Sequence, residues 1–269
     1  MQNLSTQGQL AHENKVIVIS GAGAGLGRDL ALAALRDGAQ VMLAARSAER
    51  LADLCEQLQQ DYPQRVAYCA TDITDSGACE QLFQAAAERF GSVHAVAHIA
   101  ALDTVFGDLA NSTAADWQAC FTTNVLGSMN ICQAAAPHLA AAGGGSLVLT
   151  GTQAMLKAPA HPQIAYAASK GALVAAMNSL VKEFGPQKIR VNMVIPTWMW
   201  GPAVEGYFTD QAAQQDRSVA ELLAEATVNM PLGEMPCTAD VAEAINFFCS
   251  DRSRMITGET LKVTAGEFM

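Results

Sequence analysis

Short apolar runs alternate with longer segments of helical periodicity along almost the whole chain. Apolar runs of this length, each ending at a turn or a polar residue, are typical of strands buried on both faces of a sheet. The runs that predict strands are residues 15–20, 41–44, 66–70, 93–99, 146–151, 189–196 and, after a turn, the end of 256–263. The segments that predict helices are 25–37, 47–60, 75–90, 116–138, 165–182 and one that opens at 239. This alternation predicts an α/β fold with a doubly wound parallel sheet, which binds ligands at the carboxyl ends of its strands.

The same pattern leaves no room for a second domain. Residues 1–14 are polar and predict an N-terminal tail, so the folded domain is expected over residues 15–269. Residues 197–232 have Gly and Pro at both ends and a polar amphipathic middle. A segment of this kind beside a binding site is typical of a mobile substrate lid.

A glycine-rich turn follows the first predicted strand. Gly21, Gly25 and Gly27 are spaced Gly-x-x-x-Gly-x-Gly and precede a helical segment rich in Ala and Leu. Glycines at such a turn let the backbone approach a pyrophosphate, which free amide groups at a helix N-terminus then bind. The commoner dinucleotide spacing Gly-x-Gly-x-x-Gly fails in both registers, because Leu26 or Arg28 stands where the third glycine is needed.

A tyrosine and a lysine stand one helical turn apart in a segment rich in Ala, Leu and Met. Tyr166 and Lys170 would share one face of that helix. A lysine beside a tyrosine favours the tyrosinate, and a lowered phenol pKa suits a group that exchanges protons with an alcohol or a ketone near neutral pH. By itself the pair carries little weight, because Tyr and Lys four residues apart also occur by chance on solvated helix faces.

The glycine spacing and the Tyr-x-x-x-Lys pair together resemble the short-chain dehydrogenase/reductase family, over roughly residues 13–266. The resemblance implies a Rossmann fold and an NAD(P)-dependent oxidoreductase that interconverts a secondary alcohol and a ketone. It implies that Tyr166 is the general acid and base, that Lys170 holds the ribose and lowers the Tyr166 pKa, and that Asn124 holds a water linked to that lysine. It also requires a hydroxyl that orients the substrate oxygen, for which Thr152 is the candidate.

The position of this hydroxyl leaves two registers. The serine of the family stands one residue closer to the tyrosine than Thr152 does. Alignment of the strand Leu147-Val148-Leu149 still assigns the serine's role to Thr152, 14 residues before Tyr166, with a loop that is one residue longer. A threonine hydroxyl makes the same hydrogen bond to a carbonyl oxygen as a serine hydroxyl. A shift of one residue would instead point Gln153 at the substrate.

The resemblance also gives the expected cofactor contacts. Asp72 and Ile73 match the position that contacts the adenine ring. The chain reads His98-Ile99-Ala100-Ala101 where the family usually has Asn-Asn-Ala-Gly, which removes side chains expected to brace the sheet and a glycine expected to admit the cofactor. The full set of expected contacts is Gly21, Ala24, Gly25, Leu26, Gly27, Arg46, Asp72, Ile73, Ala100, Tyr166, Lys170, Pro196 and Thr197.

The end of the second strand bears on the choice of cofactor. An NAD site usually has an acidic side chain there, which binds the ribose hydroxyls, whereas an arginine can pair with the 2′-phosphate of NADP. Ala45 stands at the acidic position and Arg46 follows it, so NADP(H) is favoured and NAD(H) stays an alternative. Two observations argue against this choice. Arg46 could simply begin the exposed helix 47–60 without binding a phosphate, and the glycine-rich loop has Ala24 rather than a basic residue.

Two tryptophans follow the sixth predicted strand, near the expected site. Thr197 replaces the glycine, and Gly201 the threonine, that the family often has there. The residues expected to line the substrate pocket are Thr152, Gln153, Met155, Trp198 and Trp200. These side chains would suit a bulky apolar or cyclic alcohol or ketone, although the tryptophans would serve equally as plain packing. His161 is interpreted as an exposed loop histidine rather than a catalytic base.

Composition narrows the partners to small molecules. The net charge is -10, which argues against nucleic-acid and anionic-membrane partners because no broad basic surface is available. No apolar run is expected to reach the length of a membrane span, and the N-terminus does not resemble a signal peptide. The seven cysteines lack Cys-x-x-Cys spacing, which indicates reduced thiols of a cytoplasmic protein. The five histidines show no metal-ligand spacing, so no metal is expected.

Two other functions stay open. The same site would also accommodate an epimerisation or dehydration, which the short chain and the glycine spacing disfavour. A non-catalytic dinucleotide-binding regulatory protein would account for the departures from the family pattern but not for the retained Tyr166, Lys170 and Asn124. The apolar helices 112–138 and 164–184 would supply the interface of a homotetramer or homodimer, as the family usually forms, or would serve as core.

Overall fold

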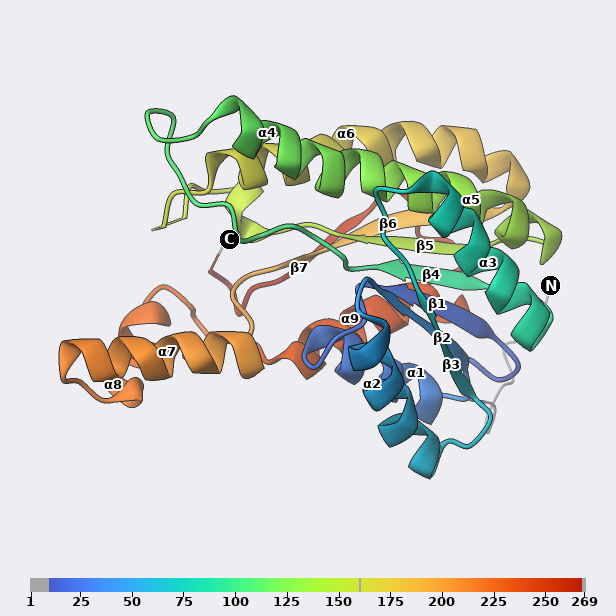
Figure 1. Ribbon diagram of the computed structural model, residues 1–269, viewed down its shortest axis with the longest axis horizontal. Coiled ribbons are helices and arrows are strands. Elements are labelled where there is room, and N and C mark those ends of the chain that lie inside the picture. Colours follow the sequence, from blue (N-terminus) through green and yellow to red (C-terminus); the bar gives the residue numbers. More distant parts are fainter. Residues whose placement is uncertain (1–9, 160, 268–269) are drawn as a thin grey trace.

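Seven parallel strands form one central sheet in the computed structural model, which describes residues 10–159 and 161–267 (Figure 1). The strands are β1 (Val16–Ser20), β2 (Gln40–Ala45), β3 (Val66–Ala70), β4 (Ala95–His98), β5 (Gly145–Thr150), β6 (Ile189–Pro196) and β7 (Thr260–Val263). Their order is β3-β2-β1-β4-β5-β6-β7, and every neighbouring pair is parallel. The chain therefore winds outward in both directions from the pair β1 and β4, which confirms the predicted doubly wound sheet.

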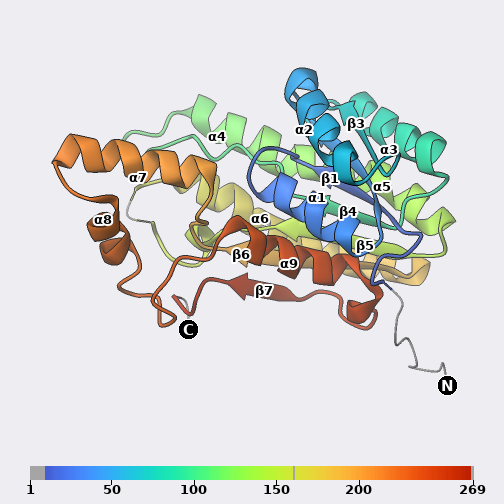
Figure 2. The same cartoon turned by 90° about the horizontal axis from the view of Figure 1, so that it is seen from below.

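Helices cover both faces of the sheet (Figure 1). The α-helices are α1 (Leu26–Arg36), α2 (Ala48–Asp61), α3 (Ser76–Phe90), α4 (Ala114–Cys120), α5 (Gly127–Ala141), α6 (Ile164–Phe184), α7 (Pro202–Gln215), α8 (Val219–Ala226) and α9 (Thr238–Cys249). Helices α1, α2 and α9 pack on one face, whereas α3, α5 and α6 pack on the other. Figure 2 shows α1 and α9 side by side on the first of these faces.

The apolar strands fill two cores because the side chains of a strand alternate between its faces. Val18 of β1 belongs to the core formed with α3 and α5, while Ile17 and Ile19 belong to the core formed with α1 and α9. All five residues of β1 are buried. The sheet is thus covered on both sides, as near-continuous apolar strands predict.

The segment predicted as one helix over 116–138 consists of three consecutive helical pieces. Helix α4 ends at Cys120, a π-helical turn η1 (Phe121–Leu126) follows, and α5 begins at Gly127. A Cβ atom on Gly127 would lie 2.8 Å from Cγ1 of Ile73, so the glycine allows a close approach that a larger residue would prevent. A π turn inside an α-helix is frequent at functional sites, and this one carries Asn124.

Helices α7 and α8 project beyond the carboxyl ends of the strands (Figure 1). Phe208 on α7 and Leu222 on α8 belong to a third apolar cluster, to which Ala265 after β7 also belongs. The rings of Trp198 and Trp200 lie 5.9 and 6.0 Å from the ring of Phe208. The predicted lid segment is therefore a pair of helices around an aromatic core, and the observed contacts of both tryptophans are packing contacts.

Residues 10–14 pack against the domain, although the sequence predicts a polar tail over 1–14. The first nine residues of that tail lie outside the described residues. His12 is 1% exposed, and its Nε2 atom lies 2.7 Å from Oδ1 of Asn246 on α9. The backbone N–H of His12 also donates to the carbonyl of Asp37. One buried histidine thus attaches this segment to the amino end of the sheet.

Helix α6 and the turn after it, Ile164–Gln187, form the one segment of the described chain that is long and apolar enough to cross a membrane. This differs from the expectation that no apolar run reaches that length. In the structure the helix supplies Leu173, Met177 and Phe184 to the core beside the sheet. Core helices of soluble proteins pass the same test of length and composition, so the segment does not indicate membrane insertion.

Candidate active site

The glycine-rich turn after β1 packs closely against the end of β4. Gly21 has a φ of +102°, and a Cβ atom on it would lie 2.4 Å from the backbone nitrogen of Ala100. A Cβ atom on Gly27 would lie 2.7 Å from Cα of Ala22. Close backbone contacts therefore require glycine at both positions, which gives a structural reason for the spacing found in the sequence.

The first turn of α1 is open to an anionic ligand. Its N-cap residue is Gly25, which has no side chain to accept from the N–H groups of that turn. A Cβ atom on Gly23 would meet nothing within 4 Å, so the loop that contains Ala24 is open on this side. Leu26 begins the helix. The N–H of Arg28 in this turn donates to the carbonyl of Gly23, and the turn has no side-chain cap. N–H groups without a cap at a helix N-terminus bind phosphate, so this turn fits the pyrophosphate of a dinucleotide.

Arg46, Asp72 and Ile73 lie just beyond the carboxyl ends of β2 and β3, which are neighbours in the sheet. Arg46 is exposed and precedes Ser47, whose hydroxyl caps the first turn of α2, so Arg46 stands outside that helix. Hydrogen bonds from the backbone and side chain of Thr74 lower the pKa of Asp72, and the charge of Arg46 adds to this effect. Ile73 is buried. The guanidinium of Arg46 and the Asp72 carboxylate are therefore close enough to interact.

Thr152 and Tyr166 meet beyond the end of β5. Burial raises the pKa of Tyr166 to about 12, and a hydrogen bond with the Thr152 side chain opposes this. The Thr152 hydroxyl also accepts the backbone N–H of Ala154. The effect of Thr152 on the phenol supports the register of the strand alignment, in which Thr152 rather than Gln153 orients the substrate oxygen. Because its pKa is high, the Tyr166 hydroxyl keeps its proton at neutral pH and can donate it.

Lys170 is 2% exposed, and its ammonium donates a 2.7 Å hydrogen bond to the carbonyl of Thr150. Burial lowers the pKa of Lys170 to about 8, and the charge of Asp103 acts in the opposite direction. The expected lowering of the Tyr166 pKa by this lysine is not observed, since burial dominates at the phenol. Oγ1 of Thr150 is buried and has no hydrogen-bond partner among the described residues. This corner of the site therefore has unused hydrogen-bonding capacity.

Asn124 connects the π turn to the helix that carries the Tyr166 pair. Its side chain is fully buried, donates to Oγ of Ser169 at 2.9 Å and exchanges hydrogen bonds with the backbone of Leu102. Ser169 in turn donates to the carbonyl oxygen of Tyr166 at 2.7 Å. The Asn124 side chain therefore positions α6, and the water that the family resemblance implies at Asn124 stays a prediction.

His98 braces the sheet. The departure of residues 98–101 from the family pattern predicts instead that the bracing side chains are lost, and this prediction is wrong. Its Nδ1 atom lies 3.1 Å from Oγ of Ser20 on β1, and its Nε2 atom lies 2.8 Å from Oγ of Ser128 on α5. The Ser128 hydroxyl donates to the carbonyl of Asn124, so it must accept from His98, which places the ring proton on Nε2. Burial lowers the His98 pKa to about 3, so the ring is neutral.

Gln153 and Thr197 meet one residue away from Thr152. Thr197 directly follows Pro196, the last residue of β6, and its hydroxyl lies 2.5 Å from Oε1 of Gln153. The same hydroxyl lies 2.5 Å from Oε2 of Glu267, which follows β7. Two strand ends and the segment after β5 therefore bring three polar side chains to one point.

The other residues expected at the substrate pocket surround the loop between β5 and α6. Met155 is half-buried and packs against the core beside the sheet. His161 is exposed, as expected, yet its Nε2 lies 3.0 Å from the Tyr207 hydroxyl and its ring stacks on Trp198 at 6.1 Å. The backbone N–H of Trp200 donates to the carbonyl of Pro236. The loop of His161 is thus attached to α7.

Three polar residues of the site are not singled out by the sequence, namely Ser128, Ser169 and Glu267. Ser169 lies within the Tyr-x-x-x-Lys motif and Ser128 stands four residues after Asn124, so helical spacing offers a signal for both. Glu267 has no such signal, because it reaches the site only through the pairing of β7 with β6.

Comparisons with known proteins agree with this geometry. A family model described as enoyl-(acyl carrier protein) reductase matches residues 21–267. An uncharacterized oxidoreductase of Methylorubrum extorquens is 28% identical, over 94% of this chain and 98% of its own length. Trihydroxynaphthalene reductase PfmaI of Pestalotiopsis fici is 28% identical, over 96% of this chain and 90% of its own length. The structure of a short-chain type dehydrogenase/reductase from Mycobacterium ulcerans matches with a TM-score of 0.86 at 26% identity, covering 96% of this chain and 91% of that chain.

These matches extend over nearly the whole described chain, from the glycine-rich turn to the turn after β7. Proteins of this kind bind nicotinamide dinucleotides and act as oxidoreductases on small molecules. The parallel sheet, the glycine spacing and the pair Tyr166 and Lys170 are the features that the resemblance requires. The chain belongs to the short-chain dehydrogenase/reductase family.

Proposed function

We propose that the protein interconverts a secondary alcohol and a ketone with a nicotinamide dinucleotide, and that Tyr166 is the general acid and base. The observation that carries this proposal is the half-buried Tyr166 with the Thr152 hydroxyl near it, one helical turn from the buried ammonium of Lys170. These groups stand at the carboxyl ends of a parallel sheet, where such folds bind their ligands. A phenolic proton and a second hydroxyl at one point suit a carbonyl oxygen that must gain a proton.

In reduction, the Thr152 hydroxyl orients the ketone oxygen and Tyr166 gives that oxygen its phenolic proton. A reduced nicotinamide dinucleotide, when bound, would supply the hydride for the carbonyl carbon, so that one hydride and one proton would convert the ketone to the alcohol. Lys170 is proposed to hold the ribose rather than to lower the Tyr166 pKa, because burial dominates that pKa. In oxidation the Tyr166 phenolate would take the proton from the hydroxyl group, and the hydride would pass from the carbon to the oxidised nicotinamide. Asn124 acts by holding α6 through Ser169.

NADP(H) is the proposed cofactor, with NAD(H) as the alternative. The open first turn of α1 supports a pyrophosphate site, and the exposed Arg46 after Ala45 supports a 2′-phosphate site. Lys170 and Tyr166 would hold the nicotinamide ribose, and Pro196 and Thr197 would flank the nicotinamide ring. The residues proposed for the pyrophosphate, adenine and 2′-phosphate are Gly21, Ala24, Gly25, Leu26, Gly27, Ala100, Asp72, Ile73 and Arg46.

Titration of the purified protein with NADPH and NADH, followed by nicotinamide fluorescence, tests the cofactor site. We expect tighter binding of NADPH, and we expect Arg46→Ala to reduce that preference by about tenfold or more, as for the loss of a charged hydrogen-bond pair. Arg254→Ala at the opposite end of the sheet removes the same charge and should leave the preference unchanged. Equal binding of the two cofactors would reject the role of Arg46, and binding of neither would reject the proposed function.

A bulky apolar or cyclic substrate is proposed for the same site. The aromatic cluster of the lid, which contains Trp198, Tyr207 and Phe208, supports this choice. The relative named trihydroxynaphthalene reductase is named for a polycyclic aromatic substrate. Turnover of a set of cyclic ketones in the presence of NADPH, compared with short acyclic ketones, tests the proposal. Preference for the acyclic ketones would reject it.

A homotetramer or homodimer is also proposed. Leu126 on η1 is 59% exposed and Phe121 is 36% exposed, so apolar side chains remain uncovered beside α6. Burial of such residues in an interface would remove apolar surface from water. Light scattering during size-exclusion chromatography tests the assembly, and a monomer at all concentrations would reject it.

A further inference from the structure

A carboxylate lies at the candidate active site, and the proposed reaction does not use it. Glu267 Oε2 lies 2.5 Å from the Thr197 hydroxyl, which itself lies 2.5 Å from Oε1 of Gln153. Thr197 is 5% exposed, and Gln153 directly follows Thr152. The carboxylate is therefore linked, through two side chains, to the residue next to the hydroxyl that contacts Tyr166.

The meeting point of these side chains holds more acceptors than donors. The Thr197 hydroxyl has one proton, whereas the facing oxygens of Gln153 and Glu267 can only accept. Both short contacts become hydrogen bonds when the side-chain amide of Gln153 is flipped, which exchanges its oxygen and nitrogen. Its N–H then donates to the Thr197 hydroxyl, and that hydroxyl donates to Glu267. The Glu267 carboxylate then keeps further acceptor capacity.

The turn that carries Glu267 is held between the lid and the site. Its backbone N–H donates to the carbonyl of Thr264 at 2.9 Å, and Ala265 between them has a φ of +50°. This left-handed conformation is unfavourable for a residue with a Cβ atom, and such strain concentrates at functional sites. The carbonyl of Ala265 also accepts the N–H of Leu232 from the end of the lid segment. The position of the carboxylate is thus fixed by contacts on both sides.

We propose that Glu267 selects substrates by charge. It favours alcohols and ketones that carry an ammonium or hydroxyl donor away from the reacting carbon, and it disfavours those that carry a carboxylate there. This inference rests on the proposed function, because it places the reacting oxygen at Thr152 and Tyr166. A carboxylate with spare acceptor capacity stabilises a donor and repels an anion beside it. The aromatic cluster of the lid contributes apolar contacts that do not distinguish charge, so discrimination falls to Glu267.

Three cyclohexanones provide the test: 4-aminocyclohexanone, 4-methylcyclohexanone and 4-oxocyclohexanecarboxylate. On the ring carbon opposite the carbonyl they carry a positively charged, a neutral and a negatively charged group, respectively. The kcat/KM value of each is measured near neutral pH for the unchanged protein and for Glu267→Gln, with whichever nicotinamide cofactor binds. Glu259→Gln is the matched control, because it removes the same charge from an exposed residue at the other end of β7.

We expect the unchanged protein to prefer the amino ketone over the carboxylate ketone. Glu267→Gln should reduce that ratio by about tenfold or more, as for the loss of a hydrogen bond to a charged group, with little change for the methyl ketone. Glu259→Gln should keep the ratio of the unchanged protein. Glu267→Lys should reverse the preference, with thermal unfolding used to show that both variants are folded.

An equal ratio in the unchanged protein and in Glu267→Gln overturns the inference. If the cofactor binds but none of the ketones is reduced, the proposed reaction fails, and the charge preference is then measured by calorimetry as the Kd of each compound for the cofactor-loaded protein. A ratio of Kd values that collapses in Glu267→Gln supports charge selection without the reaction. An unchanged ratio of Kd values, or no binding of any of the three compounds, overturns it.

Discussion

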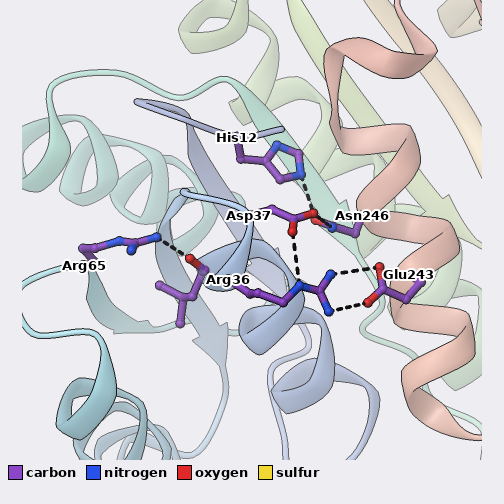
Figure 3. A network of polar contacts seen from close by, with 7 residues as sticks. His12, Arg36, Asp37, Arg65, Glu243 and Asn246 are labelled. Carbon is purple, nitrogen blue, oxygen red and sulfur yellow. Dashed lines mark hydrogen bonds and ion pairs between the residues drawn. The ribbon is translucent and has the colours of Figure 1, made fainter. Parts of the chain in front are cut away.

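Polar clusters stand at both ends of the sheet, and they differ in how completely their groups are paired. At the amino end, Figure 3 shows a chain of contacts in which each side chain finds a partner within the protein. His12 contacts Asn246, Asn246 donates to Asp37, and Arg36 pairs with both Asp37 and Glu243. This cluster joins the segment before β1 to α1 and α9.

At the carboxyl end the groups are paired less completely. Oγ1 of Thr150 has no partner within the described part of the chain, the first turn of α1 has no side-chain cap, and the Glu267 carboxylate keeps acceptor capacity. Buried polar groups in native proteins are normally paired, so unused capacity in one place indicates a ligand site. The difference indicates that a polar cluster which completes its own hydrogen bonds holds secondary structure together, whereas one that does not is available for binding and chemistry.

The largest effect is expected from Tyr166→Phe at the carboxyl end. The variant loses the phenolic proton but keeps the ring, so kcat should fall by about 10²–10⁴-fold while the cofactor still binds. Steady-state turnover and the nicotinamide fluorescence titration, applied to the same preparation, measure the two quantities. Turnover close to that of the unchanged protein would show that Tyr166 is not the general acid.

A pair of asparagine variants compares the two ends directly. Asn246→Ala removes the partner of the buried His12 and of Asp37, so the free energy of unfolding should fall by about 1–3 kcal/mol while kcat/KM of the folded protein is unchanged. Asn124→Ala releases Ser169 and the backbone of Leu102, so it should lower both quantities. Urea unfolding and steady-state kinetics provide the measurements. Equal losses of kcat/KM in the two variants would contradict the distinction between the ends.

His98→Asn should change how stability depends on pH. Burial lowers the His98 pKa to about 3 from an ordinary value of 6.5. Between these values the unfolded chain binds more protons than the folded one, so the histidine makes the protein less stable as the pH falls from 6.5 towards 3. Asparagine does not titrate there, so any stability advantage of the unchanged protein over the variant should shrink between pH 7 and pH 5. Urea unfolding at both pH values measures it, and a constant difference would reject the buried neutral ring.

Local sequence patterns predict those parts of the molecule whose contacts lie close along the chain. Tyr166 and Lys170 lie one turn apart on α6, and helical periodicity places them on one face before any tertiary contact is known. The close packing of Gly27 against Ala22 likewise lies within one turn of neighbouring residues, whereas Gly21 packs against Ala100 after another strand. Each apolar strand is predicted for the same reason, because alternation within a few residues decides which core each side chain enters.

Contacts between distant segments explain what the sequence does not predict. His98 braces the sheet through Ser20 and Ser128, which belong to two other elements. A comparison of position 98 alone with the family pattern does not include these partners, so it predicts that the bracing contacts are lost. The high pKa of Tyr166 comes from burial, a property of the whole fold rather than of the spacing to Lys170. Glu267 enters the site only after β7 has paired with β6.

The smallest effect is expected from Glu243→Gln within the amino-end cluster. Glu243 and Arg36 form two contacts, of which the shorter is 2.9 Å, yet their side chains are 52% and 56% exposed. An exposed ion pair contributes at most about 1 kcal/mol, and salt screens it, so the loss should be smaller than that of Asn246→Ala and should diminish at high salt. Urea unfolding at low and high salt measures both trends. A loss as large as that of Asn246→Ala, and independent of salt, would show that charge rather than the burial of His12 and Asn246 holds this end of the sheet together.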